Sequence, residues 1–328
     1  MSDKDDGAGE FELIETWFAP LSTSYDGAFG LTDDAAVLDV ADARNIVVTT
    51  DMLVSGVHFL DDTPAASIAA KALRSNLSDL AAMAAEPFAY TLSLALPQHP
   101  GDDWLDGFSQ ALGVEQQMFS IALIGGDTVS TSGPLSMCIT AFGRVEPGRE
   151  LRRSGAKPGD LVFVSGDIGA SAMGLRVLRG EVEGLSEAEA EILVQRHYRP
   201  QPRIDLARGL GGLAHSAIDI SDGLVQDLGH ICRHSGLGAR IEIKRIPITD
   251  TVMKASGGNM VDVLGGGEDY ELLFTAPAAN RIVVEEAANK ANVDVTVIGE
   301  MHESEGIKLI DADGDEISAD GISGFRHF

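Results

Sequence analysis

The chain has few residues of the kinds that build several common classes of protein. Its only cysteines, Cys138 and Cys232, lie among aliphatic neighbours, so we expect neither a disulfide framework nor a zinc site, and we expect a reducing compartment. No apolar run reaches the length of a membrane span, and the acidic first residues are unlike a signal peptide. The cytoplasm is therefore the expected location.

Basic residues are also scarce, with 24 Lys and Arg against 51 Asp and Glu, which gives a formal net charge of −27. Such a charge argues against non-specific binding to nucleic acid or to an anionic membrane, and it favours metal ions and small or cationic partners. The 328 residues, 44% of them hydrophobic, suffice for two ordinary domains. The turn-forming residues 152–160 predict a connection, so we expect domains at 1–150 and 151–328.

Hydrophobic periodicity predicts α+β organisation. In the first half it predicts helices at 10–18, 67–85 and 103–117 and strands at 46–50, 89–96, 121–124 and 135–145. Asp51 is expected to end its strand, and Gly125-Gly126-Asp127 is expected to form a turn. In the second half, strands at 161–165, 217–220, 239–243, 272–274 and 295–298 alternate with helices after Gly169, at 203–213, from Gly223 to His234 and at 278–291, before a hairpin near 311–314. We predict a mixed-sheet first domain and an α/β second domain.

Acidic residues recur at the ends of apolar strands or on the packed side of a helix. They are Asp33-Asp34, Asp51, Asp79, Asp127, and Asp219 with Asp222. Any one of them has an ordinary interpretation as a helix cap or turn residue. Several ionised carboxylates in apolar surroundings are costly unless a cation compensates them, so the set as a whole indicates a metal site.

The expected metal follows from the ligand type. Carboxylates and hydroxyls without a Cys or His cluster favour Mg²⁺ or Mn²⁺, and Mg²⁺ commonly completes its shell with substrate phosphates. Glycine pairs such as Gly125-Gly126 can offer backbone N–H groups to phosphates, although tight turns also need them. Arg153 is either a phosphate ligand or a surface arginine of the connection. The chain has neither a Walker loop nor a kinase His-Arg-Asp triplet, so the common nucleotide folds are not indicated.

These residues resemble the thiamine-monophosphate kinase family, in order and over nearly the whole chain. The motifs that carry the resemblance are Gly30-Leu31-Thr32-Asp33-Asp34, Thr49-Thr50-Asp51, His58-Phe59, Asn76-Leu77-Ser78-Asp79, Gly125-Gly126-Asp127-Thr128, Arg153-Ser154-Gly155, Asp219-Ile220-Ser221-Asp222-Gly223 and Gly266-Gly267-Glu268-Asp269-Tyr270-Glu271. The resemblance implies a two-domain fold like that of aminoimidazole ribonucleotide synthetase, dimerisation through the N-terminal domain, and transfer of phosphate from ATP to thiamine phosphate with several Mg²⁺ ions.

The resemblance also assigns roles to residues. The metal ligands it implies are Asp34, Thr49, Thr50, Asp51, Asp79, Asp127, Asp219 and Asp222, of which Asp51, Asp79, Asp127 and Asp222 are expected to be essential for the transfer. The nucleotide contacts it implies are Gly126, Asp127, Arg153 and Ser221. The substrate contacts it implies are His58, Glu268 and Phe325. The chain departs from the family pattern at Thr32, Ala84 and Phe325, where the family usually has Gly, Gly and an aromatic residue with a polar tip.

Plainer interpretations stand beside the substrate contacts. His58 next to Phe59 is as often a packed histidine, Glu268 has the alternative of a strand-edge carboxylate, and Phe325 is either a lid or a hydrophobic plug. Two other functions compete with the kinase. One is another ATP-dependent enzyme of the same superfamily, such as a selenophosphate or aminoimidazole ribonucleotide synthetase, and the other is a non-catalytic protein that binds divalent cations.

Overall fold

The computed structural model describes residues 14–25, 43–311, 313–318, 322 and 324, and these residues group into two compact units. The first unit comprises residues 1–80 and 87–144, and the second comprises 81–86 and 145–328. The division after Arg144 lies a few residues before the expected boundary at 150. The segment 81–86 groups with the second unit because Ala81, Ala82 and Ala84 pack into its hydrophobic core.

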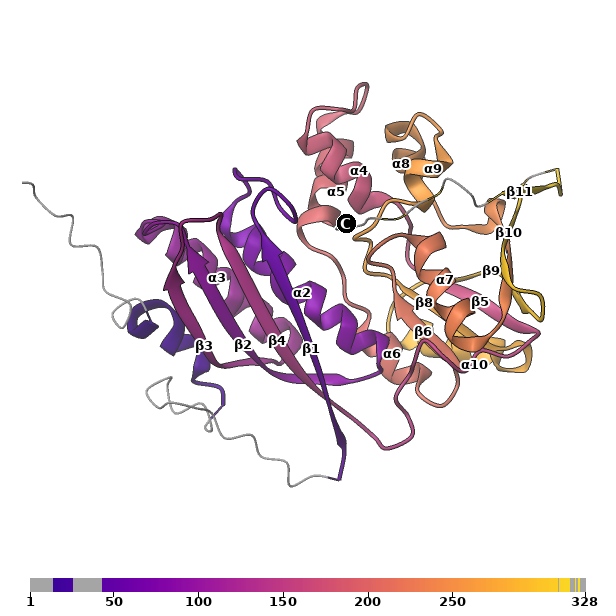
Figure 1. Ribbon diagram of the computed structural model, residues 1–328, viewed down its shortest axis with the longest axis horizontal. Coiled ribbons are helices and arrows are strands. Elements are labelled where there is room, and N and C mark those ends of the chain that lie inside the picture. The colour runs from indigo at the N-terminus through magenta and orange to yellow at the C-terminus, as the bar shows by residue number, and fades with distance from the viewer. Residues whose placement is uncertain (1–13, 26–42, 312, 319–321, 323, 325–328) are drawn as a thin grey trace, which may run out of the picture. The chain divides into compact units, whose positions relative to one another are not determined.

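The first unit is a four-stranded sheet with two long helices on one face (Figure 1). Its strands are β1 (Asn45–Val54), β2 (Glu86–Leu96), β3 (Ala122–Ser130) and β4 (Ser136–Val145), in the order β1-β4-β2-β3, and β2 and β3 are parallel. The helices are α2 (Ala65–Ala82) and α3 (Asp102–Phe119), preceded by the short turns η1 (Ile14–Phe18) and η2 (Ala19–Ser22). The apolar stripe that predicted α2 is buried, with Leu73, Leu77 and Leu80 all at 0% exposure.

Strands β1 and β3 continue through residues at which the sequence predicted that they end. Asp51 does not end its strand, because β1 continues to Val54. The expected turn at Gly125-Gly126-Asp127 is also wrong, since all three residues lie inside β3. Gly126 pairs with Leu92 of β2, and a Cβ on Gly126 would overlap the Leu92 carbonyl group. The glycine is needed here for close strand approach, and not for a turn.

The second unit is built on a mixed seven-stranded sheet with the order β11-β10-β7-β9-β5-β8-β6. The strands are β5 (Asp160–Ser165), β6 (Ser216–Asp219), β7 (Gly238–Glu242), β8 (Leu272–Pro277), β9 (Val295–His302), β10 (Gly306–Ile310) and β11 (Glu316–Ser318). The helices are α4 (Ala170–Leu178), α5 (Glu187–Tyr198), α6 (Ile204–Leu210), α7 (Leu224–Ser235), α8 (Asp250–Ala255), α9 (Met260–Leu264) and α10 (Arg281–Lys290), with short turns η4 (Ile243–Arg245) and η5 (Ala278–Asn280). The β10–β11 hairpin confirms the turn expected near 311–314.

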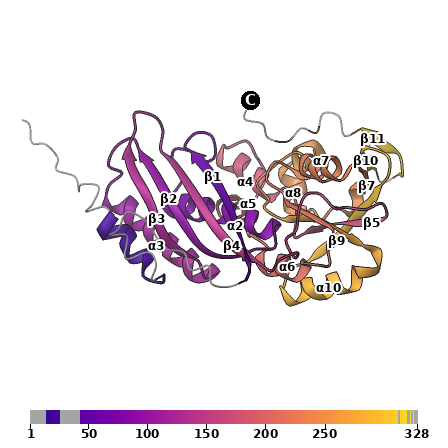
Figure 2. The ribbon, with the colours of Figure 1, turned by 60° about the horizontal axis from the view of Figure 1, so that its bottom comes forward.

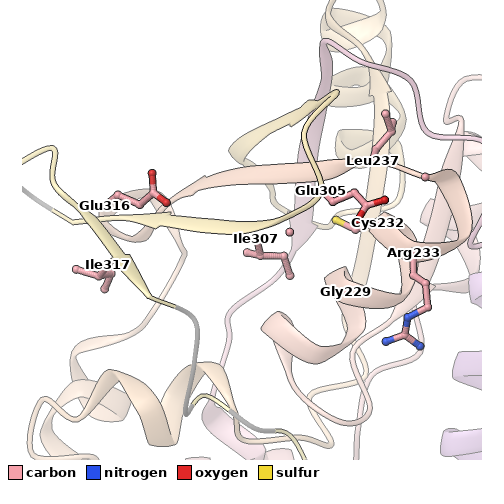
Figure 3. A pocket seen from close by; sticks show the side chains of 10 residues that line it. Gly229, Cys232, Arg233, Leu237, Glu305, Ile307, Glu316 and Ile317 are labelled. Atoms are coloured by element: carbon pink, nitrogen blue, oxygen red, sulfur yellow. The ribbon is translucent and has the colours of Figure 1, made fainter.

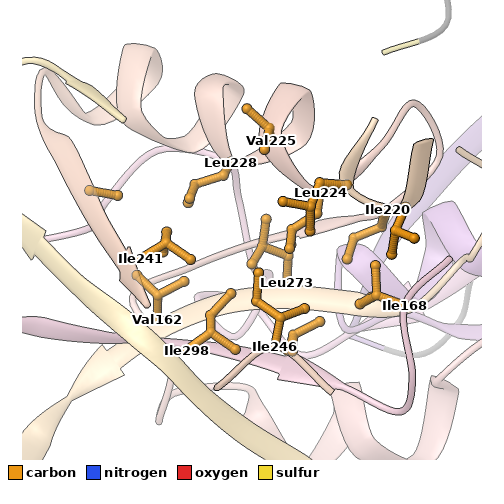
Figure 4. Packing of buried hydrophobic residues seen from close by; sticks show 14 of the residues in the cluster. Val162, Ile168, Ile220, Leu224, Val225, Leu228, Ile241, Ile246, Leu273 and Ile298 are labelled. Atoms are coloured by element: carbon orange, nitrogen blue, oxygen red, sulfur yellow. The ribbon is translucent and has the colours of Figure 1, made fainter. Parts of the chain in front are cut away.

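Helices cover both faces of this sheet. Successive side chains of β5 point to opposite faces and are buried on both. Val162 and Val164 pack with α7 in one core, which also contains Leu224, Leu228 and Leu273 (Figure 4). Phe163 points to the opposite face, where it packs with residues of α6 and α10 in a second core. Figure 2 shows α7 on one side of the sheet and α10 on the other. The second unit therefore has the predicted α/β character.

Three helices of the second unit, α5, α8 and α9, were not predicted from the sequence. A local signal for α5 is present, because Ser186 and Glu189 form a capping box in which each side chain hydrogen-bonds the other residue's backbone N–H. Ala84, which replaces the glycine expected from the resemblance, has a left-handed φ of 56°. Across the described segments, no helix is long and apolar enough to cross a bilayer.

Candidate active site

The alternation of β1 divides the Thr49-Thr50-Asp51 motif between the two faces of the sheet. Thr49 points toward α2, where its Oγ1 donates to Asp79 Oδ2 at 2.6 Å. Thr50 points to the other face, where its Oγ1 lies 3.0 Å from Thr140 Oγ1 and 3.2 Å from Cys138 Sγ on β4. Asp51 again faces α2, since the side chains of a strand alternate. A ligand beside Asp79 therefore meets the side chains of Thr49 and Asp51, and it meets Thr50 only through its backbone.

Helix α2 supplies the groups that hold Asp51 in place. The side-chain oxygen of Asn76, a residue with 0% exposure, accepts a 3.1 Å hydrogen bond from the Asp51 backbone N–H. Burial raises the pKa of the Asp51 carboxyl, while a hydrogen bond from Ser75 acts in the opposite direction. The polar side of α2 is thus aimed at β1, as its sequence indicated, and the ionised form of Asp51 gains from any further positive charge.

The His58 side chain is fixed by a tight turn after β1. Its Nδ1 accepts a 3.0 Å hydrogen bond from the Val54 N–H, and its backbone carbonyl accepts one of 2.8 Å from Nζ of Lys71, which is 2% exposed. Because Nδ1 is an acceptor, the proton of the neutral imidazole is on Nε2. His58 can therefore donate a hydrogen bond to an anionic group.

Asp127 lies at the far edge of the same sheet from Asp51. It belongs to β3, whereas Asp51 belongs to β1, and these are the two edge strands. Asp127 pairs with Ser93, which is exposed between the buried Leu92 and Leu94. The Asp127 side chain therefore points to the face opposite α2 and α3, which is also the face of Thr50. With strands about 4.8 Å apart, the two edges are roughly 14 Å apart, too far for Asp51 and Asp127 of one chain to share an ion.

The oxygen atoms around β1 suit a hard cation. Thr49, Asp51 and Asp79 offer a hydroxyl and two carboxylates on one side of the strand, which is the donor set that Mg²⁺ prefers. Nevertheless, no three His, Cys, Asp or Glu side chains gather closely enough to hold a metal ion among the residues described here. Asp34, another expected ligand, lies outside the described residues, as does Phe325.

In the second unit, the end of β6 and the start of α7 carry the other expected ligands. Asp219 is the last residue of β6 and is 3% exposed, while Asp222 accepts a 2.9 Å hydrogen bond from Gln226. The Asp227 carboxylate accepts hydrogen bonds from the N–H groups of Asp222 and Gly223, both at 3.1 Å. Burial, helped by the negative charge of Asp222, raises the pKa of Asp227 to about 7, although these hydrogen bonds act in the opposite direction. Asp227 therefore fixes the loop that presents Ser221 and Asp222.

Asp227 was not predicted as a functional residue, although an acidic residue in the first turn of a helix is a recognised start signal. Arg153 is exposed. The pKa of His230, a residue of α7, is lowered chiefly by burial and next by the positive charge of Arg153, while the negative charge of Asp222 raises it. Arg153 and Asp222 thus lie near a common side chain of this unit.

The Gly265–Glu271 loop passes directly over the end of β6. Hydrogen bonds of 2.8 Å join the Glu268 N–H to the Ser221 carbonyl and the Tyr270 N–H to the Ile220 carbonyl. A Cβ on Gly267 would overlap the Ser221 carbonyl oxygen, so glycine is required for this approach. Glu268 and Tyr270 have φ angles of 65° and 52°, a conformation that costs side-chain-bearing residues free energy and is typical of functional loops.

The same loop is anchored by two buried carboxylates. Asp269 accepts hydrogen bonds from the N–H groups of Gly169 and Ser171 at the start of α4, and burial raises its pKa to about 7. Glu271, at 0% exposure, is paired with Arg196 at 2.8 Å and with Arg203 at 2.6 Å, and it accepts a hydrogen bond from Ser165. The position of Glu268 is therefore determined by the buried residues that follow it.

An open cavity of about 830 Å³ lies elsewhere in the second unit, between α7 and the β10–β11 hairpin. It is lined by Cys232, Arg233, Ile307 and Glu316, among others (Figure 3). These α7 residues belong to the C-terminal part of the helix, whereas Asp222 precedes its N-terminus. The cavity is thus distinct from the loops that carry the expected ligands.

Comparison with known proteins identifies both halves of the chain. Residues 32–145 match the family model described as AIR synthase related protein, N-terminal domain, and residues 157–312 match the corresponding C-terminal domain. Among curated proteins, the chain is 44% identical to thiamine-monophosphate kinase of Salmonella typhimurium over 324 residues, which cover 98% of each chain. It is 33% identical to the protein of the same name from Bacillus subtilis, covering 92% of this chain and 94% of that one.

Solved structures give the same result. A thiamine-monophosphate kinase from Stenotrophomonas maltophilia matches with a TM-score of 0.82 and 37% identity, covering 92% of this chain and 98% of that one. AaThiL complexed with AMPPCP and TMP matches with a TM-score of 0.76 and 31% identity, covering 92% and 97%. The hydrogenase maturation protein HypE in complex with ATP has a TM-score of 0.78 at 17% identity, which shows a common fold only.

Proposed function

Because this chain belongs to the AIR synthase related family, and within it to the thiamine-monophosphate kinases, we propose that it transfers a phosphoryl group from ATP to thiamine phosphate. The products are ADP and thiamine diphosphate. The observation that carries this proposal is the near full-length similarity to kinases of that name, one of which is bound to AMPPCP, an ATP analogue, and to TMP.

We propose that several Mg²⁺ ions accompany the nucleotide. In the first unit the proposed ligands are Asp34, Thr49, Thr50, Asp51, Asp79 and Asp127, and in the second they are Asp219 and Asp222. The burial of Asp51 and the short Thr49–Asp79 hydrogen bond support this assignment, because a buried carboxylate is stabilised in its ionised form by a cation. When bound, Mg²⁺ neutralises charge on the phosphates during transfer.

The protein side chains position the reactants. Gly126, Arg153 and Ser221 are the proposed nucleotide contacts, and the Asp227 carboxylate supports this role by fixing the backbone around Ser221 and Asp222. His58 presents an N–H donor suited to the substrate phosphate, and Glu268 presents a carboxylate suited to the cationic part of thiamine. Phe325 is proposed as a third substrate contact. A phosphate acceptor is already largely ionised at neutral pH, so the transfer requires no strong general base.

We further propose that the active form is a homodimer. The face of the first sheet opposite α2 and α3 carries apolar side chains that are exposed among the described residues, with Val48 at 55% and Met52 at 59% exposure. Such a face favours coverage by another copy. If the sheets of two copies also pair edge to edge, with β1 of one copy beside β3 of the other, Thr50 and Asp127 come to adjacent strands on the same face, and the width of one sheet no longer separates them.

A single-turnover assay tests the proposed function. ATP labelled in its γ-phosphate is mixed with excess enzyme, thiamine phosphate and Mg²⁺, and labelled thiamine diphosphate is the expected product. The matched reaction with EDTA is expected to give none. Hydrolysis of ATP without labelled thiamine diphosphate would favour another ATP-dependent enzyme of the superfamily, and Mg²⁺ binding without any ATP turnover would favour a cation-binding protein. Either result contradicts the proposal.

A further inference from the structure

The carboxylate of Glu268 is backed by a histidine that the sequence analysis did not single out. His197 belongs to α5, and its Nδ1 lies 3.4 Å from Glu268 Oε2 and 3.2 Å from Ser171 Oγ. The His197 side chain is 3% exposed, whereas that of Glu268 is 28% exposed. The imidazole is therefore the buried member of the pair, and the carboxylate is the one that can meet a ligand.

The position of His197 is fixed by close packing between α4 and α5. A Cβ on Gly174 of α4 would overlap the Leu193 carbonyl and would lie 3.0 Å from the His197 Cβ. Ser171, which contacts the imidazole, belongs to the same turn of α4 whose N–H groups bind Asp269. The helix pair therefore holds the imidazole and the Gly-rich loop in one rigid arrangement.

The proximity of the Glu268 carboxylate favours a proton on Nδ1 of His197, and the Ser171 hydroxyl oxygen beside the same nitrogen is then an acceptor. If Nδ1 carried a lone pair, it would face the negative charge of Glu268 at 3.4 Å, which is repulsive. A proton on Nδ1 makes the contact attractive and fixes the direction of the carboxylate. Glu268 follows three glycines but has a side chain despite its φ of 65°, so the loop accepts backbone strain to place a carboxylate at this point.

We propose that His197 is a positioning residue for substrate recognition, which orients the Glu268 carboxylate toward the cationic group of the substrate through its Nδ1–H. This inference rests on the proposed function, because it assigns the cation to thiamine phosphate. It adds a residue from a helix that carries none of the expected ligands. Its consequence is that the affinity for the cationic substrate depends on α5, while the affinity for ATP does not.

The test compares two substitutions of His197 with a control on the same helix. His197→Leu removes the donor, and His197→Asn keeps an N–H close to the Nδ1 position. Leu193→Ala, one turn earlier in α5 and 1% exposed, loosens the same packing without altering the donor. We expect His197→Leu to raise the KM for thiamine phosphate about tenfold, as the loss of one hydrogen bond to a charged group implies, with the KM for ATP unchanged. His197→Asn should recover most of this loss, and Leu193→Ala should lower only the melting temperature.

A double-mutant cycle tests whether His197 acts through Glu268. In a Glu268→Gln background, His197→Leu should change the KM for thiamine phosphate less than twofold, because its target is already altered. If His197→Leu does not fold, His197→Gln, which moves the donor to the Nε2 position, replaces it in the cycle. A full additional loss in the Glu268→Gln background, or a parallel rise in both KM values, overturns the inference.

Calorimetric titration of thiamine phosphate into the wild-type chain separates the two proposals. Wild-type protein that neither binds thiamine phosphate nor forms thiamine diphosphate would contradict the proposed function, and the inference with it. Wild-type protein that binds and phosphorylates thiamine phosphate, while His197→Leu behaves like Leu193→Ala, would contradict the inference alone.

Discussion

Thr49 and Asp79 are joined by a 2.6 Å hydrogen bond that links the middle of β1 to the last turns of α2. The hydroxyl is the donor, so it holds one oxygen of the carboxylate in a fixed direction. The two residues are separated by 30 positions in the sequence, and the bond exists because the polar side of α2 lies against the strand. Both residues are among the proposed metal ligands, so their relative orientation affects how tightly an ion binds.

Replacement of Thr49 by the isosteric valine should weaken metal binding more than it weakens the fold. We expect Thr49→Val to raise the Mg²⁺ concentration required for half-maximal activity roughly 10- to 100-fold, the range seen when a ligand or its oriented partner is lost. A titration of activity with Mg²⁺ at saturating ATP measures the effect. Ser136→Ala, which removes a hydroxyl from β4 that bonds only locally to Pro134, is the matched control. Equal Mg²⁺ requirements in both variants would contradict the ligand assignment.

Replacement of Asp51 by asparagine should abolish most activity without unfolding the protein. Burial raises the pKa of Asp51, which means that the folded state disfavours its ionised form. Asparagine has no charge, so the melting temperature of Asp51→Asn without Mg²⁺ should not fall below that of wild type. We expect kcat to drop at least about 100-fold, as for loss of one group that stabilises transition-state charge. The measurement is the melting temperature with and without Mg²⁺. Mg²⁺ should raise the melting temperature of wild type and of the control Asp103→Asn, at an exposed residue of α3, by the same amount. The increase should be smaller for Asp51→Asn. Near wild-type activity of Asp51→Asn at limiting Mg²⁺ would show the assignment to be wrong.

Mixing two inactive variants tests whether Asp51 and Asp127 act from different copies of the chain. In a dimer with shared sites, a heterodimer of Asp51→Asn and Asp127→Asn contains one site with both carboxylates intact. After subunit exchange, statistical mixing should restore about a quarter of the wild-type activity. Each variant exchanged with itself serves as the control. Absence of any recovery, with exchange verified by a tag on one variant, would place the two residues in separate functions.

Asp269 should make the stability of the protein depend on pH near neutrality. Its pKa is raised from 3.8 to about 7, chiefly by burial, so the folded state binds a proton more tightly than the unfolded state does. The resulting stabilisation is fully present below pH 3.8 and is lost as the pH rises through 7. The Asp269→Asn variant should therefore have a flatter dependence of melting temperature on pH between about 5 and 8 than wild type has. Asp205→Asn, at a carboxylate with 80% side-chain exposure, should leave the wild-type dependence intact. Parallel curves for all three proteins would rule out this role of Asp269.

Local sequence patterns were sufficient for most elements of the fold. The stripe of Leu73, Leu77 and Leu80 specified α2 because helical spacing places those residues on one face, and the whole stripe is buried. Gly236 was expected to cap α7 and does so with a φ of 66°. The extents of β1 and β3 were not predictable in this way, since Asp51 and Gly126 have low strand propensity and are held in strands by their neighbours in the sheet.

The sequence by itself determined that this protein has acidic groups of the type that binds Mg²⁺, together with glycines that allow close approach of the backbone. It also carried enough motifs to indicate the family. Only the tertiary structure decided which of these groups lie together. Strand alternation directs Thr49 and Thr50 to opposite faces, strand order places Asp51 and Asp127 at opposite edges, and helix packing brings His197 to Glu268. The physical reason is that these relationships depend on contacts between residues far apart in the chain, which local propensity does not encode.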